Sequence, residues 1–556
     1  MYIAHSVSAR VEWAARTQSR AAYRGEDSVV GCGMKPGFSR LWIVLPLATA
    51  LLSCSLPKKT NGGGGGGGGN ATLSLTMIDT PPANSSILSF KATITGIALN
   101  PATGSSFSLP LTSSPFGTNP MIVELTRLQS DSAYLGTFTT VPAGTYSSVT
   151  VTLANARITF ANQTGATIMV GTASCPTNSV CTVSGITPIQ SSAISFGTSG
   201  LTLSTASPQG ISLEFNLNNA ITFTNGTMAL DFSQAKAVTV ATLPRTNSNL
   251  STGQLDLIED FTGVVTSVTQ PSASSSGSVT LLSATRGTLA AKVPSGFIPD
   301  DPLALCGPTL DFTCIKQNQT ASADAILNTD GTLTLQEIEP LFSTTQDLIE
   351  GVVTSISSSN NTQFNLVATD KVLSSSSSAL NSLNLGDQVL VNLALPNPFL
   401  VDTKGLTVPV ANRNLFAGSA DTSVIFPGQS VLIQVSSFVA ASGNVIAAAT
   451  VNGPNTAVLR FSRFTASVAS QVSSLIFTIN NLPVYIPSGT PSNAAIPVFP
   501  SPPQVQTFRN ETKFDGVSDA TGLAINDRVS LRALFLENSA MSSTPAFFAA
   551  KVRKQQ

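Results

Sequence analysis

The sequence is nearly empty of histidine and tryptophan. Its single histidine is His5 and its two tryptophans are Trp13 and Trp42, so residues 43–556 contain neither residue type. Without histidine, that part of the chain cannot activate a serine or cysteine nucleophile through an imidazole, and it cannot build an ordinary zinc site. We therefore expect a protein that is not an enzyme, with no catalytic residues, no metal site and no cofactor.

Charged residues are also scarce. They make up 10% of the 556 residues, against roughly a quarter in an average soluble protein. Six of the 28 Lys and Arg residues and three of the 29 Asp and Glu residues precede Cys54, so the remaining 22 cations and 26 anions give a net charge of −4. Binding to a nucleic-acid backbone depends on clustered cations, so we expect no nucleic-acid partner. The length of the chain favours two to four domains.

Residues 34–54 read MKPGFSRLWIVLPLATALLSC and have the order of an export signal. Two basic residues precede an apolar run over 41–52, which is shorter than the about 20 residues that a bilayer-spanning helix needs. The run ends in Leu51-Leu52-Ser53-Cys54, which resembles the lipobox of bacterial lipoproteins. The resemblance implies a signal peptide over 34–53 and acylation of Cys54. An uncleaved anchor, or an ordinary signal with an incidental cysteine, is the alternative.

The segments on either side of this signal carry little structure of their own. Residues 1–33 show no coherent pattern, and we expect them to be a misassigned start, with Met34 as the true first residue, or a long basic leader. Residues 54–70 include eight consecutive glycines, 62–69. A glycine run can bury nothing and has maximal backbone freedom, so we interpret 54–70 as the lipidated cysteine followed by a flexible tether.

The export signal also predicts where the protein resides. We expect a lipid-anchored protein of the cell envelope, with the membrane as its partner through acylated Cys54 and with its body facing the periplasm or the cell surface. Ser55 follows the cysteine, and this choice resembles lipoproteins that are sent onward to an outer membrane. We therefore expect the outer membrane rather than the inner membrane.

Four further cysteines form two local couples. Cys175 lies close to Cys181, and Cys306 lies close to Cys314. Export would place them in an oxidising compartment, where short-range disulfides can pin loops, so we predict one disulfide within each couple. Metal binding is the alternative, but spacings of five and seven residues without histidine do not match a zinc site.

From residue 71 onward, apolar and polar residues alternate with a period of two. In the first segment, Leu73, Leu75 and Met77 alternate with Ser74 and Thr76. Such alternation places one face of a strand in a core and the other in water, as in an antiparallel sandwich. Turn residues such as Pro, Gly and Asn separate the strands. We predict an all-β protein that begins with a β-sandwich over 71–246.

Two segments of this region carry a family resemblance. LSLTMIDTPP at 73–82 and VPAGTYSSVTVTL at 141–153 resemble the bacterial family called domain of unknown function 4382. The resemblance implies an exported lipoprotein with an immunoglobulin- or prealbumin-like sandwich. Asp79 precedes a Thr-Pro pair, and we favour a structural role in which its side chain caps a turn over a role as a cation ligand. We expect Tyr146 to be a packing anchor whose hydroxyl bonds to nearby backbone.

The second half of the chain contains an internal repeat. DLIE at 256–259 leads into GVVTSV at 263–268, and DLIE at 347–350 leads into GVVTSI at 351–356. Further on, LNLGDQVLV at 383–391 recurs as LAINDRVSL at 523–531, and FPGQSVLI at 426–433 is a looser copy. We interpret each of these as a turn that feeds a strand.

The order of these segments resembles domain of unknown function 5666, and the resemblance implies small β-barrels of the OB type. We predict two or three such modules, over 256–340, 347–452 and, in a more divergent copy without a G-V-V opening, 457–556. An OB-like barrel alone does not imply nucleic-acid binding, because function depends on the site and not on the fold.

These features predict a non-enzymatic envelope lipoprotein whose β-modules bind an unknown ligand, such as an envelope protein or polysaccharide, or serve as a scaffold. The alternative is a carboxylate-dependent enzyme that acts on glycans, since that chemistry needs no histidine. Asp300-Asp301 and the pair Glu337 and Glu339 are the acidic candidates. Acidic pairs on exposed loops or strand faces are usually solvated, and we expect the same here.

Overall fold

The computed structural model describes residues 69–555 apart from 81–85, 118–120, 163–164, 171–172, 187–188, 192, 225–226, 246–247, 249, 302, 309, 395–397, 420, 444, 453–455, 484, 487–495, 501–511 and 538–544. The proposed signal peptide, Cys54 and the tether up to residue 68 lie outside the described residues. The chain from Gly64 to Gln556 forms one compact unit. Its described elements are almost all strands, which confirms the all-β fold.

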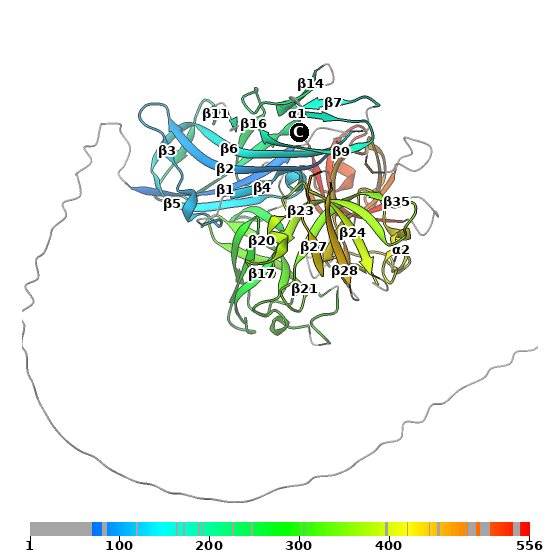
Figure 1. The fold of residues 1–556 in the computed structure, drawn as a ribbon. Coiled ribbons are helices and arrows are strands. Elements are labelled where there is room, and N and C mark those ends of the chain that lie inside the picture. Colours follow the sequence, from blue (N-terminus) through cyan, green and yellow to red (C-terminus); the bar gives the residue numbers. More distant parts are fainter. Residues whose placement is uncertain are drawn as a thin grey trace, which may run out of the picture. The chain divides into compact units, whose positions relative to one another are not determined.

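Residues 70–242 form a β-sandwich, in which β2 and β6 lie over β1 and β5 (Figure 1). One sheet has the order β16-β13-β1-β5, and the other is built on β10-β6-β2-β3, with β4, β9, β11 and β12 paired onto β2 or β6. A small third sheet has the order β14-β15-β7-β8. The apolar residues of β1, β2, β6 and β13 share one core, as their alternation predicts.

The elements of this region have the following bounds: β1 (Asn70–Thr80), β2 (Ile87–Pro101), β3 (Phe107–Ser108), η1 (Leu111–Ser113), β4 (Met121–Glu124), η2 (Leu125–Gln129), β5 (Ala133–Pro142), β6 (Gly144–Asn162), β7 (Ile168–Val170), β8 (Ala173–Cys175), β9 (Ser179–Ile186), β10 (Ile189–Gln190), β11 (Ile194–Ser195), β12 (Leu201–Leu203), β13 (Gln209–Asn216), α1 (Leu217–Ala220), β14 (Ile221–Thr224), β15 (Thr227–Leu230) and β16 (Val238–Thr242). β1 thus starts at Asn70, the last residue assigned to the tether.

The polar face of β1 does not meet water, and here the prediction from alternation is wrong. Ser74 and Thr76 are fully buried. The hydroxyl of Thr76 donates to the Asp256 carboxylate, 2.8 Å away in the next module. The second face of this sheet is therefore covered by another part of the chain, and polar residues suit it because they bond across the contact. One pair also departs from an antiparallel sandwich, since β1 and β13 run parallel.

Both predicted disulfides are present. Cys175 at the end of β8 bonds to Cys181 in β9, with Cα atoms 5.8 Å apart, and Cys306 bonds to Cys314 with Cα atoms 4.9 Å apart. Each pins a short segment of chain, and such bonds are typical of proteins outside the cytoplasm.

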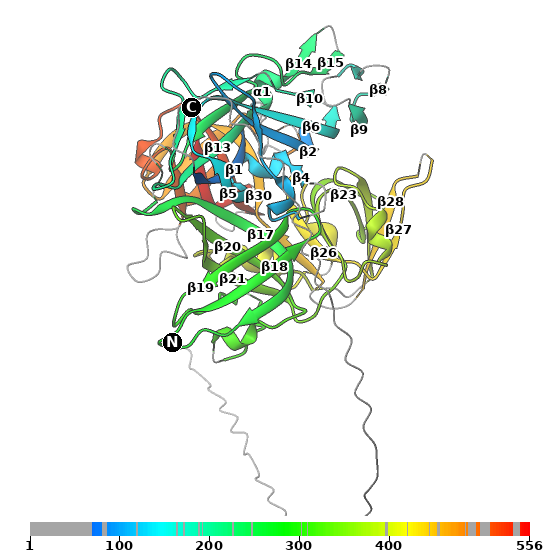
Figure 2. The same cartoon turned by 90° about the vertical axis from the view of Figure 1, so that its left-hand side faces the viewer.

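The first module is a closed barrel over residues 254–342 (Figure 2). Its strands are β17 (Gln254–Thr269), β18 (Gly277–Ser283), β19 (Gly287–Val293), β20 (Thr320–Asn328) and β21 (Leu333–Phe342), in the order β17-β18-β19-β21-β20, with η3 (Phe312–Cys314) before β20. A five-stranded barrel is what the sequence predicts for an OB-like module.

The second module repeats this strand order in an open sheet. Its five main strands are β22 (Leu348–Ile356), β23 (Gln363–Val372), β24 (Gln388–Ala394), β26 (Ser430–Gln434) and β28 (Ala447–Asn452), in the order β26-β22-β23-β24-β28. The sheet continues into β29 (Ala457–Arg460) and β25 (Leu400–Val401) beyond β26, and into β27 (Ser437–Val439) beyond β28. Its helices are η4 (Ala379–Ser382), α2 (Val410–Phe416) and η5 (Thr422–Val424).

A third module completes the repeat. Its strands β30 (Ser462–Ser473), β31 (Ile476–Asn480), β32 (Ile496–Pro500), β34 (Arg528–Glu537) and β35 (Pro545–Lys554) have the same order, and pairing of β32 with β35 joins the two ends of the sheet. β33 (Lys513–Asp515) also pairs with β35, and η6 (Ala520–Gly522) precedes β34. The number of five-stranded modules is therefore three.

One turn is repeated before the fourth strand of every module. An aspartate accepts a hydrogen bond from the backbone amide two residues later and so caps a short 3₁₀ helix. The strand begins nine residues after this aspartate, and a buried aliphatic residue lies between them. The aspartates and aliphatic residues are Asp311 and Ile315, Asp421 and Ile425, and Asp519 and Leu523. The segments 426–433 and 523–531 are thus turns that feed equivalent fourth strands. The segment 383–391 also feeds a strand, but this is β24, the third main strand of its module, so the predicted match of 383–391 with 523–531 is wrong.

The G-V-V opening has a steric cause. Val265, Val353 and Val468 each exchange two backbone hydrogen bonds with this turn, so they occupy equivalent positions in the three modules. Gly351 lies two residues before Val353, where an added Cβ would be 2.5 Å from the carbonyl oxygen of Val367 on the facing strand. The third module has Ala466 at this position, and for that reason its opening is not recognisable in the sequence.

We predict that Gly351→Ala destabilises the protein by about 1–3 kcal/mol, because the added methyl group overlaps backbone that cannot easily move. Urea denaturation followed by circular dichroism measures the loss. Gly144→Ala is the matched control, since no atom lies within 4 Å of its added Cβ, and its effect should stay within about 0.5 kcal/mol. Equal effects of the two substitutions would contradict the steric explanation.

Candidate functional site

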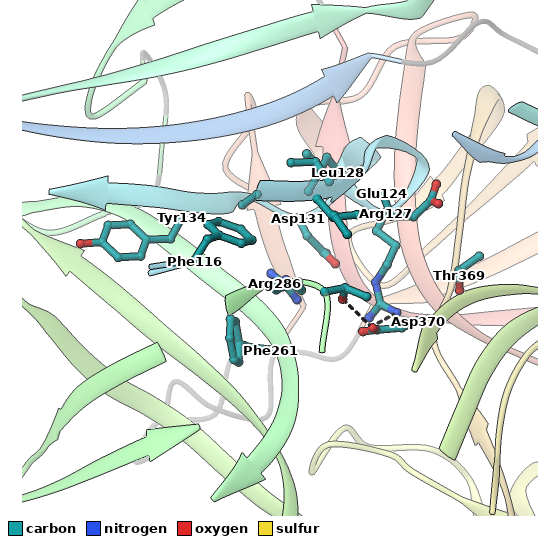
Figure 3. Close-up of a pocket in the computed structure, with 14 residues that line it drawn as sticks. Phe116, Glu124, Arg127, Leu128, Asp131, Tyr134, Phe261, Arg286, Thr369 and Asp370 are labelled. Carbon is teal, nitrogen blue, oxygen red and sulfur yellow. Dashed lines mark hydrogen bonds and ion pairs between the residues drawn. The ribbon is translucent and has the colours of Figure 1, made fainter. Parts of the chain in front are cut away.

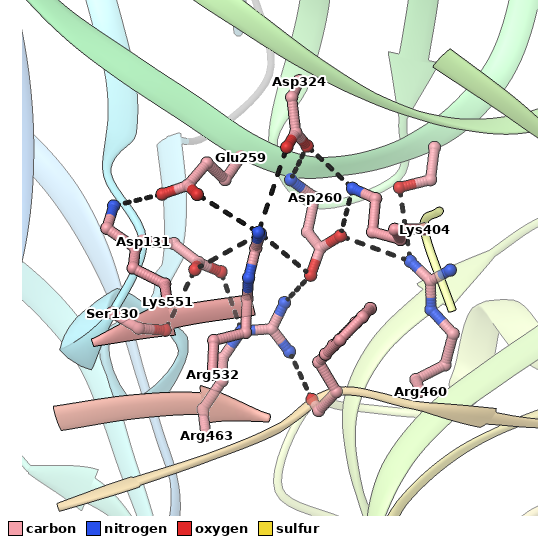
Figure 4. Close-up of polar contacts among 12 residues, drawn as sticks. Ser130, Asp131, Glu259, Asp260, Asp324, Lys404, Arg460, Arg463, Arg532 and Lys551 are labelled. Atoms are coloured by element: carbon pink, nitrogen blue, oxygen red, sulfur yellow. Dashed lines mark hydrogen bonds and ion pairs between the residues drawn. The ribbon is translucent and has the colours of Figure 1, made fainter. Parts of the chain in front are cut away.

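Nine carboxyl groups and six cations meet in a buried cluster to which the sandwich and all three modules contribute, and Figure 4 shows its central part. We call it the charged junction. Each of these side chains is less than a tenth exposed. Its members are Asp131, Glu259, Asp260, Asp324, Glu337, Glu339, Glu350, Asp370 and Asp402 with Arg127, Lys404, Arg460, Arg463, Arg532 and Lys551.

The sandwich contributes Arg127 and Asp131 from the short helix η2 and the residues after it. Glu124 fixes the start of η2, because its carboxylate accepts hydrogen bonds from the Ser89 hydroxyl at 2.6 Å and from the Thr126 amide. Arg127 then reaches the second module, where its Nη1 lies 3.1 Å from Glu350 and 3.3 Å from Asp370. η2 thus connects the sandwich to the second module.

Asp260 of the first module lies at the centre of the junction. The register of β17 against β20 shifts between Ile258 and Phe261, and Asp260 has a positive φ of 49° within this bulge. A bulge redirects a side chain that would otherwise follow the strand alternation. The Asp260 carboxylate contacts Arg463 directly, and it lies 2.8 Å from Lys404 Nζ and 3.5 Å from Arg532 Nη1.

The second module supplies two cations that face the acidic strands of the first. Lys404 Nζ lies 2.8 Å from both Asp260 and Asp324, and 3.7 Å from Glu337. Arg460 lies at the end of β29, and its Nη1 is 3.1 Å from Glu339 and contacts Asp402. The acidic side chains of β20 and β21 are therefore held by cations from a different module.

The third module contributes three cations and no carboxylate to the junction. Arg463 Nε is 2.7 Å from Asp131 of the sandwich, and Arg532 Nη2 is 3.2 Å from Glu259. Lys551 of β35 also contacts Glu259. The first module contributes five of the nine carboxylates, so oppositely charged faces of the first and third modules meet here.

The junction contains three more carboxyl groups than paired cations. The pKa of each carboxyl group depends on whether burial or the neighbouring cations have the larger effect. Burial raises the pKa of Glu259 and Glu339, and it raises that of Glu337 well above the usual value. Burial also disfavours the charged form of Asp260, but Lys404, Arg532, Arg463 and Arg460 outweigh it and hold the pKa of Asp260 well below its usual value. Asp260 is therefore ionised, while burial favours the protonated forms of the three glutamates.

A small cavity lies beside the junction, between η2 and the first and second modules (Figure 3). Arg127, Asp131, Arg286 and Asp370 line it, together with apolar residues that include Phe116 and Phe261. Its volume is about 30 Å³, which is room for about one water molecule. A sugar ring does not fit, and the carboxylates here are held by cations rather than presented to a substrate.

The LGD turn of the second module forms another contact with the sandwich. The carbonyl oxygen of Gly386 accepts hydrogen bonds from the Thr159 hydroxyl at 2.7 Å and the Thr182 hydroxyl at 3.2 Å. Asp387 forms an ion pair with Arg157. The sequence motif is therefore part of an interdomain contact.

Tyr146 and Asp79 were both predicted to have structural roles, and the structure agrees with the predicted role only for Tyr146. Tyr146 is buried, and its hydroxyl donates to the carbonyl oxygen of Pro142 at 2.8 Å, which agrees with a packing anchor. Asp79 does not cap a turn, because β1 continues through it and pairs it with Phe215 of β13. It is fully buried, and burial raises its pKa well above the usual value, with only partial opposition from the Thr80 amide.

The expectation that Glu337 and Glu339 are solvated is wrong, because both are buried against Lys404 and Arg460. Asp301 instead belongs to a loop, where its carboxylate accepts hydrogen bonds from the amides of Leu305 and Cys306. The remaining junction residues were not predicted. Their signal in the sequence is a charge inside an apolar strand of a weakly charged chain, as at Arg460 between Leu459 and Phe461.

Comparison with known proteins characterises the domain that supplies η2. Residues 70–249 match the family model of a domain of unknown function, DUF4382. The DUF4382 domain coincides with the sandwich, and the match ends before β17. No curated protein matches the chain. A solved structure, drosophila Unr CSD456, is similar at 11% identity over 53% of this chain and 97% of that chain, and its TM-score of 0.11 carries no argument.

A wider pocket of about 260 Å³ lies on the DUF4382 domain near β11 and β16. Lys236 is the one charged side chain among the described residues of its lining, which also includes Ser195, Phe232 and Gln234. Within the described ranges, no group of three or more His, Cys, Asp or Glu side chains is arranged to hold a metal ion. No helix in the described part of the chain is long and apolar enough to cross a membrane.

We predict that Asp260→Asn destabilises the protein by about 3–5 kcal/mol, because it leaves buried cations without a counter-charge. Chemical denaturation of both proteins at neutral pH measures the difference. Asp311→Asn is the control, since Asp311 is an exposed cap and Asn caps a helix as well as Asp does. A loss of less than about 1 kcal/mol for Asp260→Asn would contradict the central role of this carboxylate.

The raised pKa of Glu337 predicts a specific pH dependence. The folded state keeps a proton on Glu337 that the unfolded chain releases above about pH 4.3, so this group makes stability fall as the pH rises toward its folded pKa. Glu337→Gln removes the titration and keeps the shape of the side chain. We expect the free energy of unfolding to fall less between about pH 5 and about pH 8 in this variant than in the parent protein. Identical pH profiles would refute the assignment.

Proposed function

We propose that the chain is a lipid-anchored, non-enzymatic scaffold protein of the bacterial envelope, in which the DUF4382 domain and three β-modules act as one rigid body. The observation that carries the scaffold role is the charged junction. Residues from all four bodies meet there, and each junction carboxylate of the first module faces cations from other modules. Such an arrangement fixes how the bodies dock.

The proposed cellular location depends on the sequence. The order of basic residues, apolar run and Cys54 is typical of lipoprotein export, and the glycines after it suit a spacer between a membrane and a folded body. The two disulfides support a location outside the cytoplasm. We further propose that the exposed surface presents binding sites for an envelope protein or polysaccharide, with the outer membrane as the destination.

We expect Cys54→Ser to release the protein from the membrane fraction, because the acyl chains would have no attachment site. Mass spectrometry of the amino-terminal peptide from cells should show an acylated cysteine in the parent protein only. Ser55→Ala is the matched control, since it changes the neighbouring residue and keeps the thiol of Cys54, and it should leave membrane association unchanged. An unmodified amino terminus, or membrane association that survives Cys54→Ser in full, would refute the anchor.

A further inference from the structure

Residues 422–508 are almost free of charge. This stretch contains only two charged residues, Arg460 and Arg463. Both are buried in the charged junction, where they pair with Glu339 and Asp131. An ordinary protein surface is roughly a quarter to a third charged, whereas the described residues of this stretch expose only uncharged polar and apolar side chains.

An apolar hairpin tip lies within this uncharged stretch. β27 is the edge strand of the second module and pairs with β28, so that Phe438 lies opposite Ala449 (Figure 2). Beyond this pairing, Val439 is 66% exposed, Val445 is 70% exposed and Ile446 is 36% exposed. We call these three residues together with the half-buried Phe438 the apolar tip. These exposed side chains flank the polar turn of Ser442 and Gly443, and exposed apolar side chains close together on a surface are typical of an interaction site.

The geometry of the tip favours a lipid surface over a protein. A stable contact with a second copy or another protein needs roughly 800 Å² from each side, which four side chains at a turn do not supply. The hairpin satisfies much of its own backbone, since Ser442 and Val445 exchange two hydrogen bonds of 3.0 Å. A self-bonded turn can enter an apolar medium without leaving these groups unpaired.

We propose that the apolar tip inserts shallowly into the lipid bilayer next to the anchor and so sets a second contact between the protein and its membrane. No charge must be dehydrated on insertion, and the driving force is removal of Val439, Val445 and Ile446 from water. The proposal rests on the proposed function and adds to it, because a second contact would fix how the anchored body lies against its membrane.

A fluorescent probe placed in the tip tests this directly. Val439→Trp is suited to it because the site is exposed, so the substitution does not disturb a core. The parent protein, processed as in cells, is reconstituted with vesicles of phosphatidylcholine alone or with added phosphatidylglycerol, and its spectrum is subtracted. We expect the added indole to show blue-shifted emission and quenching by brominated acyl chains, equally in both lipids and at low and high salt, because no charge takes part.

Ile525→Trp is the matched control. Ile525 is 64% exposed but lies in a turn next to Asp527 and Arg528, so its indole should stay in water when vesicles are added. A second variant, Val439→Ser with Val445→Ser, should lower the affinity for vesicles roughly tenfold or more if both side chains leave water on binding. Both residues are exposed, so neither substitution removes a core contact, and circular dichroism checks that the variant is folded.

Three results would overturn the inference. The first is an emission spectrum of Val439→Trp that does not shift although the protein is bound to the membrane through its acyl chains. In that case the proposed anchor is correct, but the tip does not insert. The second is a shift that requires envelope proteins in the vesicles, which would make the occupant a protein. The third is an equal shift for Ile525→Trp. If Cys54 is not acylated but the Val439→Trp indole is quenched by lipid, the tip inserts and the proposed anchor is wrong.

Discussion

The structure depends on one buried carboxylate that is ionised because cations from two other modules surround it. Removing a charge from water is strongly unfavourable, and a buried ion pair stabilises a fold only when its geometry and additional hydrogen bonds offset that cost. Asp260 meets this condition through Lys404, Arg460, Arg463 and Arg532. None of these cations belongs to the barrel that carries Asp260, so the counter-charges that keep this residue ionised while it is buried come from the docked modules.

The three modules share a strand order but have diverged in charge, and this divergence makes their docking specific. Asp260 and Arg463 each lie five residues before the equivalent valines Val265 and Val468, and they form an ion pair with each other. The second module has the apolar Leu348 at this position. The equivalent position is therefore acidic in the first module, apolar in the second and basic in the third. Two copies of the same barrel could not form this contact, because like charges would meet.

The fold could be predicted from the sequence further than the junction could. Strand alternation predicted the sandwich core, and the local cysteine couples predicted both disulfides. The junction depends on contacts between residues far apart in the chain, such as Asp260 with Lys404, which alternation does not report. One local sign exists, since three extra residues, Asp260 to Thr262, separate DLIE from its glycine in the first copy only. The bulge that directs Asp260 into the junction lies at this point of the strand, between Ile258 and Phe261.

This arrangement explains where many of the few charged residues of the chain lie. Of the 22 cations and 26 anions after Cys54, the junction takes six and nine, so close to a third of them are inside the protein rather than on its surface. Much of the exterior therefore depends on Ser and Thr, which hydrogen-bond to water, sugars or backbone without a long-range field. With few charges on the surface, contacts depend more on shape, hydrogen bonding and apolar area. This suits the proposed membrane anchor, which would hold the protein close to its partners.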